Sequence, residues 1–111
     1  MNKITIDTIR NLKGSKCPFA TITAYDFTSA KLVDQAGIPL ILVGDSAAMV
    51  VYGYDTTIPV SMDEMIFLVA SVTRGTNAAL VVADMPFMSY QVSVENAIFN
   101  AGRFIKEANA Q

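Results

Sequence analysis

The sequence predicts an α/β protein whose parallel sheet is covered on both faces. Three short apolar runs, at residues 19–24, 40–43 and 79–83, are rich in β-branched and small residues and lack the polar alternation of a half-exposed strand. Amphipathic segments with helical periodicity separate these runs. Because strand–helix–strand units connect by right-handed crossovers, the three strands are expected to run parallel.

The segments around the predicted strands carry helix start and stop signals. A helix over residues 28–36 is predicted to end at Gly37, a residue type that commonly follows helix C-termini. Ser61 and Glu64 have the spacing of a capping box and open a helix that closes at Gly75. A short helix is predicted over residues 47–51 and another, after a capping Ser93, over residues 94–108, while residues 4–12 form an amphipathic segment ahead of the first strand.

Composition argues against several functional classes. The chain has 8 Lys+Arg against 10 Asp+Glu and a net charge of −2, so it lacks the basic stripe of a nucleic-acid-binding protein. Its apolar runs are far shorter than the about 20 residues that cross a membrane, and no signal-peptide pattern is present. With one cysteine, Cys17, and no histidine, neither an internal disulfide nor a zinc site is expected. These features predict a cytoplasmic protein.

The hydropathy of the chain is high for its length. Of its 111 residues, 52% are apolar and 16% charged, and the mean hydropathy is +0.40. A small domain exposes a large share of its residues and should be more polar. We therefore expect residues 1–111 to be a single incomplete domain of a larger protein, without an internal linker.

Three acids closely follow the predicted strands: Asp26, Asp45 and Asp84. The carboxyl ends of parallel strands are where α/β proteins place their chemistry, although each acid has an alternative role as a helix cap. Asp45 and Asp84 end almost wholly apolar strands, and two neighbouring carboxylates repel unless a cation or a shared proton relieves them. Oxygen ligands without His or Cys favour Mg²⁺, so Asp45 and Asp84 are the predicted metal ligands.

Ser46 adds a hydroxyl and a backbone amide beside Asp45, and the amide, at the start of a short predicted helix, can bind a carboxylate. No histidine, cysteine or lysine lies near Ser46 in the sequence to activate it, so it is not expected to act as a nucleophile. Residues 52–57 form a turn-rich loop in which Tyr54 and Asp55 either contact a ligand or only pack the loop. Glycine-rich phosphate-binding patterns are lacking, so nucleotide-dependent chemistry has no support.

Four segments resemble, in order and at matching spacing, the ketopantoate hydroxymethyltransferase family. They are Thr-Ala-Tyr-Asp at 23–26, Leu-Val-Gly-Asp-Ser at 42–46, Gly-Tyr-Asp-Thr-Thr at 53–57 and Val-Val-Ala-Asp-Met-Pro-Phe-Met-Ser-Tyr at 81–90. The resemblance runs without a gap from near Ile6 to Gln111. It implies a (β/α)8 TIM barrel of the phosphoenolpyruvate/pyruvate superfamily, of which this chain would hold roughly the first three βα units.

The resemblance also implies an activity, in pantothenate and coenzyme A biosynthesis. The family transfers a hydroxymethyl group from 5,10-methylenetetrahydrofolate to 3-methyl-2-oxobutanoate and forms 2-dehydropantoate. By position, Asp45 and Asp84 correspond to Mg²⁺ ligands that also bind the substrate, and Ser46 corresponds to the residue that holds its carboxylate. The implied partners are the 2-oxo acid, the folate and further copies of the same chain, since family members form homo-oligomers, often decamers. No nucleic acid or membrane partner is implied.

The chain departs from the family pattern in two respects. In the family, the segment after the position of Gln111 supplies a substrate-binding lysine and a metal-associated glutamate, and a later strand supplies the general base. We therefore expect no catalytic base within residues 1–111, and an isolated chain that is inactive and poorly soluble. Residues 67–70 form an apolar segment at a place where many relatives carry a His and a basic residue. This difference is expected to affect packing or a protomer interface.

Two other interpretations stay open at this point. One is another metal-dependent 2-oxo acid carbon–carbon lyase or mutase of the same superfamily, because one fold hosts many reactions. The other is a non-catalytic barrel fragment that acts as an association module.

Overall fold

The structure, a computed structural model, describes residues 2–111. Helices and strands follow one another in the predicted order, with α3 and α4 in succession between β2 and β3. Their bounds are α1 (Ile6–Leu12), β1 (Thr21–Thr23), α2 (Phe27–Gln35), β2 (Leu40–Val43), α3 (Ala47–Val50), α4 (Met62–Gly75), β3 (Leu80–Ala83) and α5 (Val94–Ala108). The α/β prediction is confirmed, although β1 and β3 are shorter than the predicted runs at 19–24 and 79–83.

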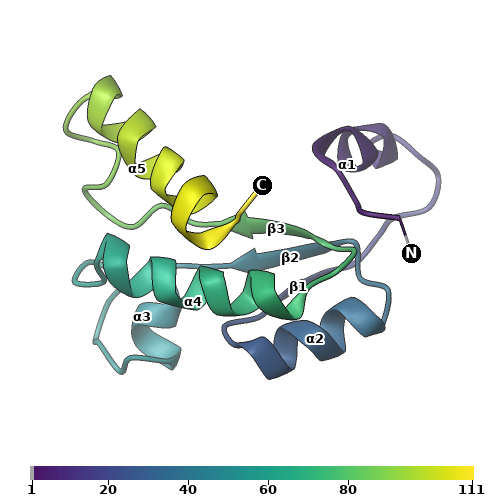
Figure 1. Cartoon of the computed structure of the whole chain (residues 1–111), viewed down its shortest axis with the longest axis horizontal. Coiled ribbons are helices and arrows are strands. Elements are labelled where there is room, and N and C mark those ends of the chain that lie inside the picture. Colours follow the sequence, from purple (N-terminus) through teal and green to yellow (C-terminus); the bar gives the residue numbers. More distant parts are fainter. Residues whose placement is uncertain (1) are drawn as a thin grey trace.

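Within the described residues, the strands form one parallel sheet in the order β1-β2-β3. Thr21 of β1 aligns with Leu40 of β2, and Leu40 aligns with Leu80 of β3. All three strands therefore end at the same edge of the sheet, which lies on the left in Figure 1. This edge carries the loops that follow the strands.

The core lies between the sheet and α4. Ile41 and Val43 of β2 point to the same face because side chains alternate along a strand, and both are fully buried. Met65 and Val69 of α4 are also fully buried and belong to the same apolar cluster. Helix α4 packs against α2 on one side and α5 on the other, so it is the central helix of the layer (Figure 1).

The predicted helix boundaries agree closely with the structure. Ser61 and Glu64 form the expected capping box at the start of α4, and the Ser93 side chain accepts the backbone N–H of Asn96 at the start of α5. Gly37 follows α2 with a φ of +83°, a left-handed conformation that glycine adopts without steric cost. Local capping and turn chemistry thus set the ends of these helices.

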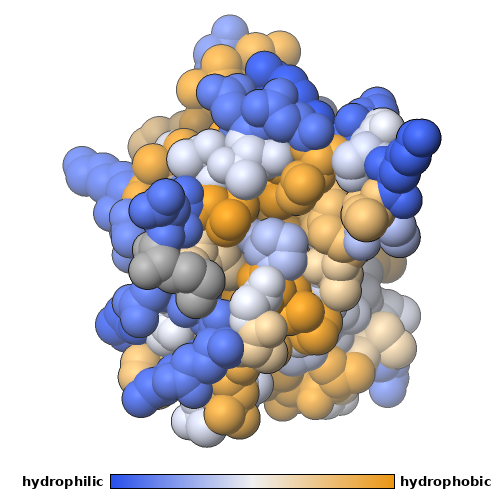
Figure 2. Space-filling model, turned by 90° about the vertical axis from the view of Figure 1, so that its right-hand side faces the viewer, coloured by the Kyte–Doolittle hydropathy of each residue, from blue (hydrophilic) through white to orange (hydrophobic). Residues whose placement is uncertain are grey.

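Helix α1 lies at the opposite end of the sheet from the carboxyl ends of the strands (Figure 1). It is attached through Ile4, whose N–H donates to the Ala78 carbonyl at 2.7 Å, and through Lys3, whose Nζ donates to the Ala79 carbonyl at 2.9 Å. Figure 2 shows apolar side chains in the middle of this end of the molecule, surrounded by hydrophilic ones. Cys17 is exposed in the loop before β1.

A buried carboxylate ties α2 to the segment that enters β3. Asp34 is only 5% exposed, and its two oxygens accept the backbone N–H groups of Asn77, Ala78 and Ala79 at 3.0, 3.0 and 2.7 Å. Burial raises the pKa of this carboxyl, but the three hydrogen bonds and the nearby Lys3 outweigh burial, so the pKa lies below its ordinary value. Asp34 is therefore held as a charged acceptor.

None of the helices found in residues 2–111 has both the length and the apolar character needed to span a bilayer.

Candidate functional site

Asp45 and Asp84 meet at the carboxyl edge of the sheet. The backbone N–H of Asp45 donates to Asp84 Oδ2 at 2.9 Å, and the backbone N–H of Asp84 donates to the Val43 carbonyl at 2.9 Å. Both aspartates are half-buried. The structure thus brings together the two acids that the sequence singled out, because parallel register places the ends of β2 and β3 side by side.

Gly44 allows this close approach. A Cβ atom at Gly44 would stand 3.3 Å from Ser46 Oγ and 3.4 Å from Asp84 Oδ2. Gly44 is itself buried, so these polar atoms lie directly over its backbone. The glycine therefore brings Ser46 and Asp84 to the same small region of the sheet edge.

Ser46 is joined to β1 through Tyr25. The two hydroxyl oxygens lie 2.6 Å apart, although the residues are 21 positions apart in the sequence. Ser46 is exposed and Tyr25 is half-buried. Sequence reasoning did not select Tyr25, but the available signal was its position directly before Asp26 at the end of the first strand.

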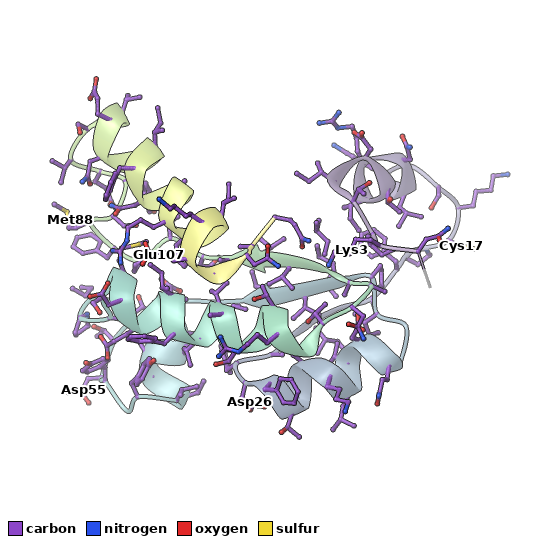
Figure 3. All side chains as sticks on the ribbon, viewed as in Figure 1. Lys3, Cys17, Asp26, Asp55, Met88 and Glu107 are labelled. Atoms are coloured by element: carbon purple, nitrogen blue, oxygen red, sulfur yellow. The ribbon has the colours of Figure 1, made fainter. Side chains whose placement is uncertain are left out.

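Asp26 does not join the other two acids in a shared hydrogen bond. Its carboxylate accepts the backbone N–H of Ser29 at 2.7 Å and caps α2 (Figure 3). This hydrogen bond also lowers the pKa of Asp26 below its ordinary value. The helix-cap interpretation of Asp26 is confirmed, and its carboxylate is committed to the backbone of α2.

The loop after α3 is tied to the start of α4. Tyr54 donates its hydroxyl proton to Glu64 Oε2 at 2.9 Å, and Tyr52 donates to the Glu64 backbone carbonyl at 3.0 Å. The hydrogen bond to Glu64 raises the pKa of Tyr54, while the pKa of Glu64 is lowered by the Ser61 backbone N–H and then by Tyr54. Asp55 is exposed at this end of the molecule (Figure 3). Tyr54 therefore packs the loop, with Glu64 as a partner that the sequence did not indicate.

The loop that follows Asp84 is held by buried polar groups. Asn100 of α5 donates its side-chain N–H to the Ser89 carbonyl at 2.7 Å, and the Ser89 hydroxyl donates to the Pro86 carbonyl at 2.6 Å. Met88 adopts a φ of +69°, a conformation that is uncommon outside glycine, and projects at the same end of the molecule as Asp55 (Figure 3). These contacts fix the segment that leaves β3 next to Asp84.

The carboxylate pair offers only part of a metal coordination shell. Among residues 2–111, no cluster of three or more His, Cys, Asp or Glu side chains could hold a metal ion. Two carboxylates such as those of Asp45 and Asp84 would suit a metal that takes one or two protein carboxylates and completes its shell with water and substrate oxygens. Mg²⁺ has this coordination preference, so the donor chemistry fits it.

Residues 3–111 match the sequence profile described as ketopantoate hydroxymethyltransferase. The chain belongs to this family. It is 50% identical over 111 residues to a protein of Carboxydothermus hydrogenoformans named 3-methyl-2-oxobutanoate hydroxymethyltransferase, covering 100% of this chain and 40% of that protein. Proteins of the same name from Syntrophus aciditrophicus and Syntrophobacter fumaroxidans are 52% and 53% identical over 108 and 110 residues, covering 97% and 99% of this chain. The chain spans 40% and 39% of these two relatives.

Proposed function

We propose that the protein to which this chain belongs transfers a hydroxymethyl group from 5,10-methylenetetrahydrofolate to 3-methyl-2-oxobutanoate and forms 2-dehydropantoate, a step toward pantothenate and coenzyme A. The observation that carries the proposal is the contact between Asp84 and the backbone of Asp45 at the carboxyl edge of the sheet. This contact occurs in a chain that is 50% identical to a protein named 3-methyl-2-oxobutanoate hydroxymethyltransferase.

We further propose that residues 1–111 are one incomplete domain, the first part of a (β/α)8 barrel of the phosphoenolpyruvate/pyruvate superfamily. The parallel order β1-β2-β3 supports this proposal. An apolar groove of about 450 Å³ borders β3 and is lined by residues that include Leu80, Val82 and Ile105. The backbone N–H of Gln111 donates to the Val81 carbonyl at 3.3 Å, which is consistent with a further strand beside β3.

In the proposed site, Asp45 and Asp84 hold Mg²⁺ and the 2-oxo acid, and Ser46 holds the substrate carboxylate. A bound Mg²⁺ supplies Lewis-acid polarisation of a carbonyl oxygen. The Asp45 N–H fixes one oxygen of Asp84, so the orientation of this carboxylate is set before a ligand arrives. The exposed Ser46 hydroxyl can donate to a carboxylate oxygen, a charge-assisted hydrogen bond. The general base belongs, in this proposal, to the part of the protein outside residues 1–111.

We also propose a cytoplasmic homo-oligomer, in keeping with small water-soluble substrates. Phe67 of α4 is 71% exposed, and Ile98 and Phe99 of α5 are 68% and 67% exposed. Large apolar side chains that remain exposed on a helix are typical of surfaces that become covered on assembly. Phe67 belongs to the segment 67–70, in which many relatives are expected to carry a His and a basic residue, and its exposure favours an interface role over core packing.

The complete gene product tests the proposed function. We expect formation of 2-dehydropantoate from 3-methyl-2-oxobutanoate and 5,10-methylenetetrahydrofolate, loss of the reaction with a chelator and recovery with Mg²⁺. If oxaloacetate or phosphonopyruvate competes for the site more strongly than 3-methyl-2-oxobutanoate does, a lyase or mutase is favoured instead. The 111-residue chain on its own should be inactive, so turnover by it would contradict the placement of the base.

A further inference from the structure

The hydroxyl groups of Tyr25 and Ser46 form a contact that joins the ends of β1 and β2. Their oxygens lie 2.6 Å apart, a normal distance for an O–H···O hydrogen bond between two hydroxyls. Ser46 is exposed at the carboxyl edge, next to Asp45. The pair therefore lies in the same part of the molecule as the contact between Asp45 and Asp84.

The backbone holds Tyr25 in place from both sides. On one side, the N–H of Ala24 donates to the Leu42 carbonyl at 3.1 Å and extends the pairing of β1 with β2. On the other side, the carboxylate of Asp26 caps α2 through the N–H of Ser29. A residue fixed at both neighbours presents its side chain in a defined direction, which a positioning role requires.

The Ser46 hydroxyl is not used by its own helix. Ser46 precedes α3 with φ −56° and ψ −16°, a helical conformation, and its side chain makes no capping hydrogen bond. Its backbone carbonyl accepts the N–H of Met49 at 3.0 Å, and the next residues, Ala47 and Ala48, are fully buried. The backbone of Ser46 is thus fixed while its hydroxyl is free to bond to Tyr25.

Either hydroxyl can donate at this distance. We assign the donation to Tyr25, because a phenolic O–H is in general a stronger hydrogen-bond donor than an aliphatic O–H. With Tyr25 donating, the hydrogen of Ser46 remains available for a second acceptor. Because Ser46 is the more exposed of the two, that acceptor can come from a bound ligand.

We propose that Tyr25 is a positioning residue that orients the Ser46 hydroxyl toward the carboxylate of a small 2-oxo acid. The inference rests on the proposed function, because that function assigns the carboxylate to Ser46. Tyr25 itself need not touch the substrate. It fixes the direction of the Ser46 O–H bond, which could otherwise point in several directions. Because the two hydroxyls form a hydrogen-bonded chain, the bond from Tyr25 also polarises the Ser46 O–H and makes it a stronger donor.

A double-mutant cycle on the complete gene product tests this inference. The variants are Tyr25→Phe, Ser46→Ala and their combination, and the readout is the Kd for 3-methyl-2-oxobutanoate by calorimetry with saturating Mg²⁺. Tyr25→Phe should weaken binding about three- to ten-fold, the loss that one hydrogen bond of ordinary strength explains. In the Ser46→Ala background, the same change should alter Kd less than about two-fold, because the group that Tyr25 orients is gone.

A second ligand and a matched variant separate positioning from structural damage. Tyr25→Phe should weaken pyruvate binding by the same factor, because the two acids share the carboxylate, and should leave the KM for the folate unchanged. Tyr52→Phe removes a hydroxyl that bonds to the Glu64 carbonyl and not to Ser46, so its effect should be additive with Ser46→Ala. Thermal unfolding of each variant checks that the fold is retained.

The outcomes distinguish the inference from the proposed function. If the wild-type protein turns over but Tyr25→Phe and Ser46→Ala change the Kd independently, the positioning role is overturned and the proposed function stays intact. Coupled effects on 2-oxo acid binding without formation of 2-dehydropantoate support the positioning role and contradict the proposed reaction. A protein that does not bind 2-oxo acids contradicts both.

Discussion

The carboxylate of Asp84 accepts the backbone N–H of Asp45 at 2.9 Å, so one candidate metal ligand fixes the peptide group of the other. This contact crosses from the end of β3 to the loop after β2. It gives Asp84 two separable properties: an acceptor that holds the loop, and a negative charge that can bind a cation. Substitutions can remove these properties one at a time.

Asp84→Asn should abolish cation binding while preserving the loop. An asparagine oxygen can still accept the Asp45 N–H, but the amide carries no charge, and neutral ligands bind Mg²⁺ poorly. We expect Mg²⁺-dependent binding of 3-methyl-2-oxobutanoate by the complete gene product to be lost in calorimetry, with little change in the unfolding temperature. Asp84→Ala should additionally lower the free energy of unfolding by about 1–3 kcal/mol, since the Asp45 N–H loses its partner. Normal Mg²⁺-dependent binding by Asp84→Asn would remove Asp84 from the metal site.

Gly44→Ala should weaken the site by steric contact. The added methyl group would lie 3.3 Å from Ser46 Oγ, so this hydroxyl must move by a few tenths of an ångström, and 3.4 Å from Asp84 Oδ2, the edge of ordinary van der Waals contact. We expect a measurably weaker 2-oxo acid affinity in calorimetry. Gly102→Ala in α5 is the matched control, because a Cβ there meets no atom within 4 Å. The control should stabilise the helix by about 0.5–1 kcal/mol without changing the affinity, and equal affinity losses in both variants would contradict the steric argument.

Much of the fold and part of the site follow from local rules in the sequence. Ser61 with Glu64 predicts the start of α4, and apolar runs predict the strands, because capping and periodicity act over a few residues. The pairing of Asp45 with Asp84 follows from the common edge of parallel strands. Tyr25 was not predicted, because its contact with Ser46 depends on side-chain reach between two strand ends, which no sequence spacing encodes. The tie between Tyr54 and Glu64 escaped prediction for the same reason.

Gly75→Ala should be among the most damaging small substitutions in the chain. A Cβ at this last residue of α4 would stand 2.5 Å from the Phe27 carbonyl oxygen and 3.3 Å from the backbone nitrogen of Lys31. Both are backbone atoms of α2, so the whole helix must shift to accept a methyl group. We expect a loss of about 1–3 kcal/mol in urea unfolding of the complete gene product. An unchanged free energy of unfolding would show that α2 moves more easily than this packing implies.

The buried carboxylate of Asp34 should make stability depend on pH. Burial raises its pKa, but the hydrogen bonds from Ala79, Asn77 and Ala78, with Lys3 nearby, lower it further than burial raises it. A carboxyl whose pKa is lower in the folded state stabilises the fold above its unfolded pKa of about 3.9. That contribution is lost as the pH falls through the folded pKa. The free energy of unfolding should therefore fall on acidification below about pH 4.

Asp34→Asn isolates this contribution from those of the other acids. Asparagine offers one acceptor oxygen. If that oxygen takes the place of Oδ1, it still accepts the N–H groups of Ala78 and Ala79, but its NH₂ group then faces the Asn77 N–H that Oδ2 now accepts, so two donors oppose each other. We expect Asp34→Asn to lower the free energy of unfolding in urea by about 1–3 kcal/mol at pH 7. The difference from the wild-type protein should shrink at low pH, where the Asp34 carboxylate becomes protonated and no longer stabilises the fold by its charge. Asp7→Asn is the control, because the Asp7 side chain is 81% exposed on α1 and should change stability by less than about 0.5 kcal/mol. A difference between wild type and Asp34→Asn that stays constant from pH 7 to about pH 3 would show that the charge of Asp34 contributes nothing beyond its shape.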